Sequence, residues 1–334
     1  MLVAMIEVRG LTKHYGQTVA VQDLTFTVRP GQVTGFLGPN GAGKSTTMRM
    51  ILGLDRPTSG TALIDGKPYA ELKHPFRQVG ALLDAKWVHP NRSARAHLEW
   101  MAASNDLPKS RVEEVLRLVG LSEVAGKSAG GFSLGMSQRL GLAGALLGDP
   151  KVLLFDEPVN GLDPEGILWI RRFMQRLAAE GRTVLVSSHL LSEMSQTADH
   201  LVVIGRGRLI SDSTTSDFIE RASEASVRVR SPQLDELRSL LTSHGMTVKE
   251  NDGNADGAAL IVNGVASDAV GTLAAEHQIT LFELAPQRGS LEEAFMRMTG
   301  GDVQYHGEIG SPADATVVMD KPADSEPLFT GGTK

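Results

Sequence analysis

A glycine-rich loop at residues 38–46 constrains the fold of this chain more than any other feature. The loop fills every fixed position of the pattern G-x-x-x-x-G-K-S, and its residues are Gly38, Pro39, Asn40, Gly41, Ala42, Gly43, Lys44, Ser45 and Thr46. The apolar stretch Val33–Leu37 before it predicts a buried strand, and Thr46–Gly53 after it predicts a helix. A strand, a glycine loop and a helix in this order hold a phosphate chain, so the sequence predicts an α/β nucleotide-binding domain.

The residues of this loop suit phosphate chemistry. Glycines allow backbone N–H groups to approach phosphate oxygens, and the start of the helix adds partial positive charge. We expect Lys44 to reach the β- and γ-phosphates of a nucleotide and the Ser45 hydroxyl to ligate Mg²⁺. The alternative, an ordinary glycine-rich turn before a helix, does not require all the fixed positions.

The composition limits the classes of protein to which the chain could belong. With 334 residues, 41% of them hydrophobic, it has room for a nucleotide-binding domain and a smaller second unit. A net charge of −6 argues against a nucleic-acid-binding surface, and the absence of cysteine excludes disulfides and thiolate metal sites. The first residues do not resemble a secretory signal, and no apolar run approaches the roughly 18 residues of a membrane span. Work at a membrane would therefore require a partner that provides the span.

Two carboxylates follow a second apolar run. Val152–Phe155 predicts a buried strand, and Asp156 and Glu157 come directly after it. We expect Asp156 to hold Mg²⁺, directly or through water, and Glu157 to polarise an attacking water. The alternative is an acidic surface turn. His189 stands at the end of the next predicted strand, Thr183–Ser188, where ligands bind in open α/β sheets, although a single histidine there is more often structural.

Two further residues are candidates with an ordinary alternative. Tyr15 lies upstream of the phosphate loop and could stack on a base, but an isolated tyrosine is more often a packing residue. Ser133 precedes an apolar helix, which makes it a plausible N-cap beside a helix start that favours an anion. A capped surface helix is the simpler interpretation of that stretch.

The remaining patterns divide the chain into two units and a tail. Two or three antiparallel strands precede the phosphate loop, and a hairpin within residues 201–210 closes the first unit. From Glu71 to Gly131 the composition becomes more helical, which predicts a helical insertion in the α/β domain. Asp212–Ser216 is polar and small, which predicts a linker.

The second unit has the order β-α-β-β-α-β, which predicts a small ferredoxin-like α+β sandwich. Its last strand is predicted at Ile279–Leu284, and we expect a helix at Leu291–Met298 to pack on it. No catalytic constellation occurs in this unit, so a scaffold, a dimer contact and a regulatory surface stay open. Residues 301–334 contain few large apolar side chains, and we expect a disordered tail.

Together these motifs resemble the ATP-binding subunit of an ABC transporter, most closely that of bacterial drug and antibiotic exporters. The resemblance covers about residues 5–215. It implies a nucleotide-binding domain at 1–215 with a RecA-like core, an antiparallel β-subdomain and a helical subdomain at about 71–145. It also implies an accessory domain at 222–299, and ATP and Mg²⁺ as cofactors.

The resemblance gives each motif a role. Residues 38–46 correspond to the Walker A loop, and Val152–Asp156 to Walker B, with Glu157 as the catalytic carboxylate. The other implied roles are adenine stacking by Tyr15, contact across a dimer by Asn160–Asp163, the switch histidine at His189, and the ABC signature at Ser133, Leu134, Gly135, Met136, Gln138 and Arg139.

Two positions depart from the family pattern. The usual signature LSGGQ is replaced by Phe132–Met136, which keeps Ser133 and Gly135 but ends in methionine, a form familiar among drug exporters. Asp84 stands where the family has a glutamine that senses Mg²⁺ and the attacking water. Aspartate can ligate Mg²⁺ but cannot donate an amide hydrogen bond. A metal contact, a water-mediated contact and a simple loop role therefore stay open for Asp84.

The resemblance also implies partners. Two nucleotide-binding subunits, identical or different, would close head to tail on ATP, and a separate integral membrane permease would dock near Asp84–Pro90 on the cytoplasmic face of the membrane. One alternative is a soluble ABC ATPase acting on ribosomes or nucleic acid. The single cassette and the absence of heptads in the roughly 90 residues between Lys44 and Ser133 argue against it, and no nucleic acid is expected. A regulator that binds ATP without hydrolysis is a third interpretation, which Glu157 and His189 disfavour.

Overall fold

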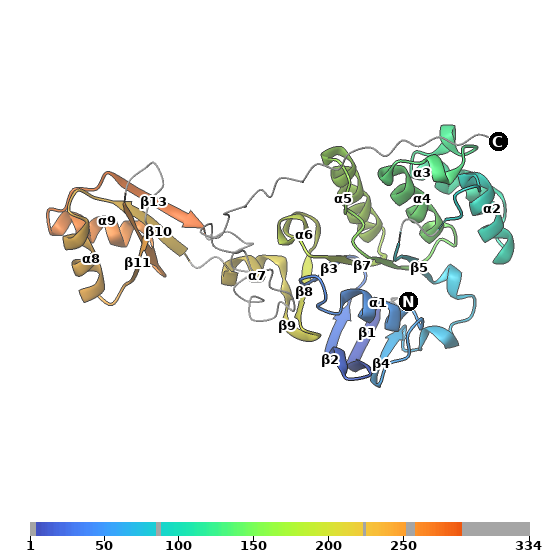
Figure 1. Ribbon diagram of the computed structural model, residues 1–334, viewed down its shortest axis with the longest axis horizontal. Coiled ribbons are helices and arrows are strands. Elements are labelled where there is room, and N and C mark those ends of the chain that lie inside the picture. The colour runs from blue at the N-terminus through green and yellow to red at the C-terminus, as the bar shows by residue number, and fades with distance from the viewer. Residues whose placement is uncertain (1–4, 85–87, 223–224, 252–257, 289–334) are drawn as a thin grey trace, which may run out of the picture. The chain divides into compact units, whose positions relative to one another are not determined.

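The computed structural model describes residues 5–84, 88–222, 225–251 and 258–288 (Figure 1). A six-stranded sheet runs through the first unit, in the order β5-β6-β7-β3-β8-β9. Its neighbours from β5 to β8 are parallel, and β9 pairs antiparallel with β8. The strands are β5 (Val79–Leu82), β6 (Val152–Phe155), β7 (Thr183–Ser188), β3 (Val33–Leu37), β8 (His200–Gly205) and β9 (Arg208–Thr214). Since parallel strands end at one edge, the segments that follow β3, β6 and β7 meet there.

Both faces of this sheet are covered, which explains why every residue of β3, β6 and β7 is buried. Figure 1 shows helices α2–α5 on one side, and α1 with a small antiparallel sheet on the other. The helices are α1 (Lys44–Ile51), α2 (Ala94–Ser104), α3 (Ser110–Leu118), α4 (Leu134–Leu146), α5 (Pro164–Ala179), α6 (Leu191–Thr197) and α7 (Thr215–Ala222). Each side has its own cluster of buried apolar side chains.

The antiparallel sheet has the order β2-β1-β4. Its strands are β1 (Ile6–Tyr15), β2 (Thr18–Val28) and β4 (Ser59–Ile64). The antiparallel strands predicted before the phosphate loop are therefore confirmed as β1 and β2, while β4 follows α1. No helix in the described ranges is both long and apolar enough to cross a membrane.

Two expectations for the first unit are wrong. The stretch from Glu71 to Gly131 is not helical throughout, because β5 lies within it and forms the edge of the central sheet. The segment Asp212–Ser216 is not a linker: it completes β9 and begins α7, and Phe218 of α7 is fully buried in the core. Of the polar residues that suggested a linker, Asp212–Thr214 pair with β8, and the other two begin α7.

The second unit confirms the ferredoxin-like topology, with four strands in the order β11-β12-β10-β13 and each neighbouring pair antiparallel. Its elements are β10 (Ala225–Arg230), α8 (Leu234–Ser243), β11 (Thr247–Asn251), β12 (Ala259–Asn263), α9 (Ser267–Glu276) and β13 (Glu283–Arg288). The last strand begins four residues later than predicted, because Ile279 packs into the core of this unit before the strand starts. The helix expected at Leu291–Met298 and the tail lie outside the described residues.

Candidate functional site

The phosphate loop leaves β3 and turns into α1 in a conformation that requires glycine. Gly41 and Gly43 have φ angles of +83° and +102°, which side chains other than glycine rarely adopt. A Cβ atom on Gly43 would lie 2.5 Å from the carbonyl oxygen of Ala20, and one on Gly38 would lie 2.6 Å from that of Ile204. Gly38 and Gly43 therefore let the loop pack directly against the backbone of neighbouring segments, and this packing fixes its course.

Lys44, the first residue of α1, folds back over this loop. Its ammonium donates to the carbonyl oxygens of Gly38 (2.7 Å) and Pro39 (3.2 Å), and only 7% of the residue is exposed. The same nitrogen lies 3.2 Å from Oε1 of Glu157. A buried ammonium beside a helix N-terminus is a strong attractor for a polyanion.

The two carboxylates predicted after β6 are anchored by the neighbouring strands. The backbone N–H of Asp156 donates to the carbonyl of Leu82, which closes β5 against β6 (2.8 Å). The buried Ser187 hydroxyl, near the end of β7, donates to Oδ1 of Asp156 and accepts the backbone N–H of Glu157 (2.9 Å). Glu157 has a φ of +48°, and this turn directs its side chain toward Lys44.

His189 completes this cluster, because its Nδ1 lies 2.9 Å from Oε2 of Glu157. Both carboxylate oxygens of Glu157 are therefore held, one by Lys44 and one by His189. The structure brings together Lys44, Asp156, Glu157 and His189 from three separate segments, the start of α1 and the turns after β6 and β7. Ser187 belongs to the same cluster, and the sequence analysis did not identify it. The sequence offered one indication of this role: Ser187 lies near the end of the predicted strand Thr183–Ser188, and Asp156 follows the strand that precedes it in the chain.

Tyr15 ends β1, where 48% of the residue is exposed. Its hydroxyl donates to Oδ2 of Asp55 (3.0 Å). Partial burial, and the hydrogen bond to the Asp55 carboxylate, raise the pKa of Tyr15 above its ordinary value of 10, so the hydroxyl is protonated at neutral pH. Base stacking by Tyr15 stays a prediction.

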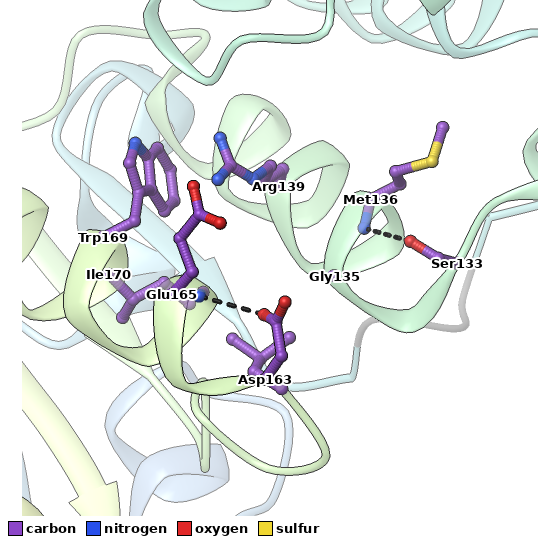
Figure 2. Close-up of a pocket in the computed structure, with 10 residues that line it drawn as sticks. Ser133, Gly135, Met136, Arg139, Asp163, Glu165, Trp169 and Ile170 are labelled. Atoms are coloured by element: carbon purple, nitrogen blue, oxygen red, sulfur yellow. Dashed lines mark hydrogen bonds between the residues drawn. The ribbon is translucent and has the colours of Figure 1, made fainter.

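The predicted signature segment forms the start of α4 and borders a hollow of about 240 Å³ (Figure 2). Ser133 is the N-cap, as expected, since its side chain accepts the backbone N–H of Met136 (3.2 Å). Asp163 caps α5 on the facing side of the hollow by accepting the N–H of Gly166 (3.0 Å). Ser133 and Gly135 thus lie with Asp163, in a hollow that neither Lys44 nor Glu157 lines.

The candidate metal ligands lie in two separate parts of the first unit. Ser45 is exposed next to Lys44, and Asp156 lies in the carboxylate cluster, so hydroxyl and carboxylate oxygens of the kind that Mg²⁺ prefers are present. No group of three or more His, Asp or Glu side chains suited to a metal occurs in the described part of the chain. Asp84 is exposed two residues beyond β5 and lines a mainly apolar hollow of about 340 Å³. Its metal role stays a prediction.

Comparison with known proteins identifies the family to which this chain belongs. A family model described as ABC transporter matches residues 21–160, and a model of an AAA domain matches residues 127–195. An uncharacterised ABC transporter ATP-binding protein of Bacillus subtilis is 37% identical over 300 residues, which cover 89% of this chain and 96% of the relative. The chain belongs to the ABC transporter family of ATP-binding proteins. It therefore has an ATP-binding domain of the kind that hydrolyses ATP to drive transport.

Further comparisons agree with this family. The bacitracin transport ATP-binding protein BcrA of Bacillus licheniformis is 35% identical over 301 residues, covering 89% of this chain and 98% of the relative. A solved structure titled as the ATP-binding subunit of an ABC transporter is 29% identical, with a TM-score of 0.59 over 65% of this chain and 92% of that one. The predicted ABC fold is thus confirmed. A model described as a domain of unknown function matches residues 225–292, the ferredoxin-like unit.

Proposed function

We propose that this ABC ATPase energises the export of antibiotics or other amphiphilic compounds through a separate membrane permease. Support comes from the bacitracin transport relative, which matches both units of the chain. A lantibiotic transport ATP-binding protein of Streptococcus pyogenes is also 35% identical over 206 residues, covering 62% of this chain and 89% of the relative.

The observation that carries the catalytic part of the proposal is the position of Glu157 between Lys44 and His189. The γ-phosphate of ATP competes with Oε1 of Glu157 for the Lys44 ammonium. When Lys44 turns to the phosphate, Oε1 becomes available to accept a proton from the attacking water. His189 holds the other oxygen and so keeps the carboxylate directed at that water.

The metal assignment follows from the oxygen donors described above. Ser45 and Asp156 would hold Mg²⁺, which withdraws charge from the phosphate oxygens when it is bound. Ser187 orients Asp156 for this task, because its hydroxyl donates to one carboxylate oxygen and leaves the other for the metal or its water.

A second nucleotide-binding subunit completes each ATP site in this proposal. The N-terminus of α4 carries free N–H groups and the Ser133 cap, which suit the γ-phosphate of an ATP bound to the other subunit. Ser133 and Gly135 line an open hollow away from Lys44 of their own chain, as a site completed by a partner requires. Either a second copy or a different cassette could supply the other half.

The permease would dock beside Asp84. The 340 Å³ hollow there is lined mainly by apolar side chains, including those of Leu54, Tyr69, Phe76 and Met101, and an amphipathic segment of a membrane protein could fill it. Docking of this kind places the chain at the cytoplasmic face of the membrane as a peripheral subunit.

Replacement of Glu157 by glutamine tests the catalytic assignment. Glu157→Gln keeps the shape of the side chain but removes the proton acceptor, so we expect ATP turnover to fall by about 100-fold or more while ATP binding is retained. Glu180→Gln, which alters an exposed carboxylate that pairs with Arg176, is the matched control and should leave turnover unchanged. Full turnover in Glu157→Gln would show that another group is the base.

Co-purification tests the transport assignment. Chain recovered from membranes should carry a multi-span protein that changes its ATPase rate, and cells with both proteins should lose export when Glu157→Gln replaces the native chain. Recovery of the chain alone, with an ATPase rate that responds to ribosomes or DNA instead of membranes, would contradict the proposal.

A further inference from the structure

The segment between α1 and β4 is bound to the end of β1 at several points. The Lys13 ammonium donates to the carbonyl of Arg56 (2.7 Å), and the backbone N–H of His14 donates to the Thr58 hydroxyl (3.0 Å). The third side-chain contact is the hydrogen bond from Tyr15 to Asp55. The strand that ends in Tyr15 is therefore fastened to the segment that leaves the phosphate-binding helix.

Asp55 is the central residue of this connection. Its Oδ2 accepts both the Tyr15 hydroxyl (3.0 Å) and Nε of Arg49 (2.7 Å), and its Oδ1 accepts Nη2 of Arg49 (3.2 Å). The hydrogen bonds from Arg49 are the largest cause that lowers the pKa of Asp55, which keeps the carboxylate ionised. Arg49 belongs to α1, so a bidentate ion pair joins Tyr15 to the helix that begins at the phosphate loop.

The Tyr15 ring is also held from one side. The Lys13 ammonium lies 4.8 Å from the ring centroid, in cation–π distance, while its hydrogen bond to Arg56 fixes its position. Nearly half of the Tyr15 residue nevertheless stays exposed. An aromatic side chain that is oriented by a charged partner and still open to solvent is prepared for a flat ligand.

We propose that Asp55 is a positioning residue for the nucleobase: with Arg49 it holds the Tyr15 ring where the adenine of ATP stacks. The inference rests on the proposed base-stacking role of Tyr15. A free tyrosine on the surface loses side-chain freedom when a base stacks on it, and this loss weakens binding. Asp55 imposes the orientation beforehand, so the nucleotide gains more of the stacking energy.

Binding measurements on the purified full chain separate the base from the phosphates. Isothermal titration with ATP and with inorganic tripolyphosphate, which has no base, reports the two contributions. For Asp55→Ala we expect the dissociation constant for ATP to rise about two- to tenfold, with no change for tripolyphosphate. Tyr15→Phe, which keeps the ring and removes the same hydrogen bond, should give a similar rise. The double variant Tyr15→Phe/Asp55→Ala should be no weaker than either single variant, since both remove one interaction.

Two further variants complete the test. Asp55→Asn keeps an oxygen that accepts the tyrosine hydroxyl, and it should retain most of the affinity for ATP. Asp235→Ala, which removes an exposed aspartate paired with Arg238 in the second unit, is the matched control and should bind ATP as the native chain does. A thermal unfolding scan of each variant identifies any that fail to fold. If Asp55→Ala does not fold, the ATP affinity of Tyr15→Phe decides the question, because this variant removes the same hydrogen bond.

The outcomes distinguish the inference from the role of Tyr15 itself. Tyr15→Ala should raise the dissociation constant for ATP about tenfold and leave that for tripolyphosphate unchanged, because the stacking surface is lost. If Tyr15→Ala binds ATP normally, the base-stacking role fails. If Tyr15→Ala weakens ATP binding but Asp55→Ala and Tyr15→Phe do not, Tyr15 stacks without help and Asp55 is not a positioning residue. An equal loss for ATP and tripolyphosphate in Asp55→Ala would also overturn the inference, since it would show a general effect on α1.

Discussion

Ser187 connects the side chain of Asp156 to the backbone of Glu157. Its buried hydroxyl donates to Asp156 and accepts the backbone N–H of Glu157, whose φ of +48° is unusual for a residue with a side chain. The hydrogen bond from Glu157 holds the backbone in this turn, and the turn directs the carboxylate to Lys44 and His189. In the proposed mechanism Ser187 therefore acts through the positions of Asp156 and Glu157.

Removal of this hydroxyl should affect turnover more than binding. For Ser187→Ala we expect kcat for ATP hydrolysis to fall by about ten- to a hundredfold, because a catalytic group displaced by about 1 Å loses that much efficiency. KM for ATP should stay within about twofold of its native value, since Lys44 and the phosphate loop are unchanged. Steady-state kinetics measure both constants, with Ser211→Ala in β9 as the control. A rise in KM with kcat intact would instead place Ser187 in ATP binding.

Among the single residues of the site, the sequence predicted those that belong to a contiguous motif. It missed those whose partners are distant in the chain and become neighbours only in the folded structure. The loop 38–46 and the pair Asp156 and Glu157 are contiguous, so their pattern is visible without a structure. Ser187 lies 31 residues from Asp156, and Asp55 lies 40 residues from Tyr15. Only strand pairing brings these partners together, and a serine or aspartate in such a position looks like many others in the chain.

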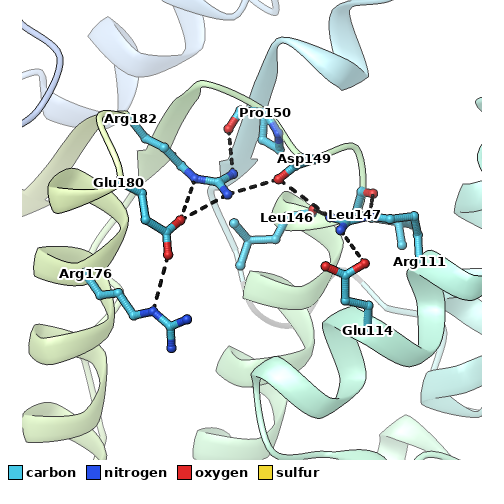
Figure 3. A network of polar contacts seen from close by, with 9 residues as sticks. All are labelled: Arg111, Glu114, Leu146, Leu147, Asp149, Pro150, Arg176, Glu180 and Arg182. Atoms are coloured by element: carbon cyan, nitrogen blue, oxygen red, sulfur yellow. Dashed lines mark hydrogen bonds and ion pairs between the residues drawn. The ribbon is translucent and has the colours of Figure 1, made fainter.

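Among the helices, α4 depends on an arginine from its neighbour. Arg111 of α3 donates to the carbonyl oxygens of Leu146 (2.9 Å) and Leu147 (3.2 Å) at the end of α4, and it pairs with Glu114 (2.6 Å) (Figure 3). These carbonyls are at the end of a helix, where intrahelical partners run out. Arg182 makes a second anchor nearby through the carbonyl of Pro150 (2.9 Å).

Arg111 should therefore contribute measurably to stability. We expect Arg111→Ala to lower the free energy of unfolding by about 1–2 kcal/mol, because a charge-assisted contact to two helix-end carbonyls is lost. Arg176→Ala, which removes an exposed pair with Glu180 on α5, should change it by less than about 0.5 kcal/mol. Urea unfolding of both variants makes the comparison. Equal losses would indicate that Arg111 is no more than a surface charge.

A buried histidine makes the helical subdomain sensitive to acid. His97 of α2 is buried, and burial, with a smaller effect from the charge of Arg92, lowers its pKa from 6.5 to about 4. The unfolded chain gains a proton on this residue as the pH falls below about 6.5, whereas the folded chain stays unprotonated until about pH 4. The stability that the neutral histidine provides is thus present above pH 6.5 and is lost as the pH falls through this window.

Replacement of His97 should remove this part of the pH dependence. Between pH 6.5 and 4 the free energy of unfolding of the native chain should fall by up to about 3 kcal/mol more than that of His97→Leu. Denaturant unfolding at several pH values measures the difference. The exposed His244 of the second unit serves as the control, and His244→Leu should follow the native curve. Parallel curves for the native chain and His97→Leu would refute the assignment.

The strand before the phosphate loop and the strand before the acidic pair were predicted because they are short runs in which every residue except Thr34 is apolar. β5 was missed since it has four residues, two of them glycine and alanine, in a stretch of helical composition. Its formation depends on pairing with β6, which sequence does not show. The end of β9 and the start of α7 were missed for a related reason: their small polar residues resemble a loop until β8 and the core provide partners.

At the scale of the whole molecule, we propose that the nucleotide-binding domain extends beyond the predicted residue 215 to the end of α7. Thr215 begins α7 and fastens it to the loop before β8 by two hydrogen bonds, from its N–H to the carbonyl of Asp199 (3.0 Å) and from its hydroxyl to that of Ala198 (2.6 Å). Phe218 then enters the apolar cluster that also contains Met194 and Leu201. The second unit has a separate core of its own, so its topology could be predicted from its own pattern.

Truncation tests this boundary. A chain that ends at residue 222 keeps α7, and it should fold and bind ATP like the native protein, because no core residue of the first unit is removed. A chain that ends at residue 214 loses Phe218, and loss of a buried phenylalanine costs about 3–5 kcal/mol, a large part of the stability of a typical domain. Its thermal transition should therefore shift down strongly or disappear. Phe218→Ala in the full chain is the matched variant and should show a comparable loss. If the chain ending at 214 were as stable as the one ending at 222, α7 would not belong to the nucleotide-binding domain.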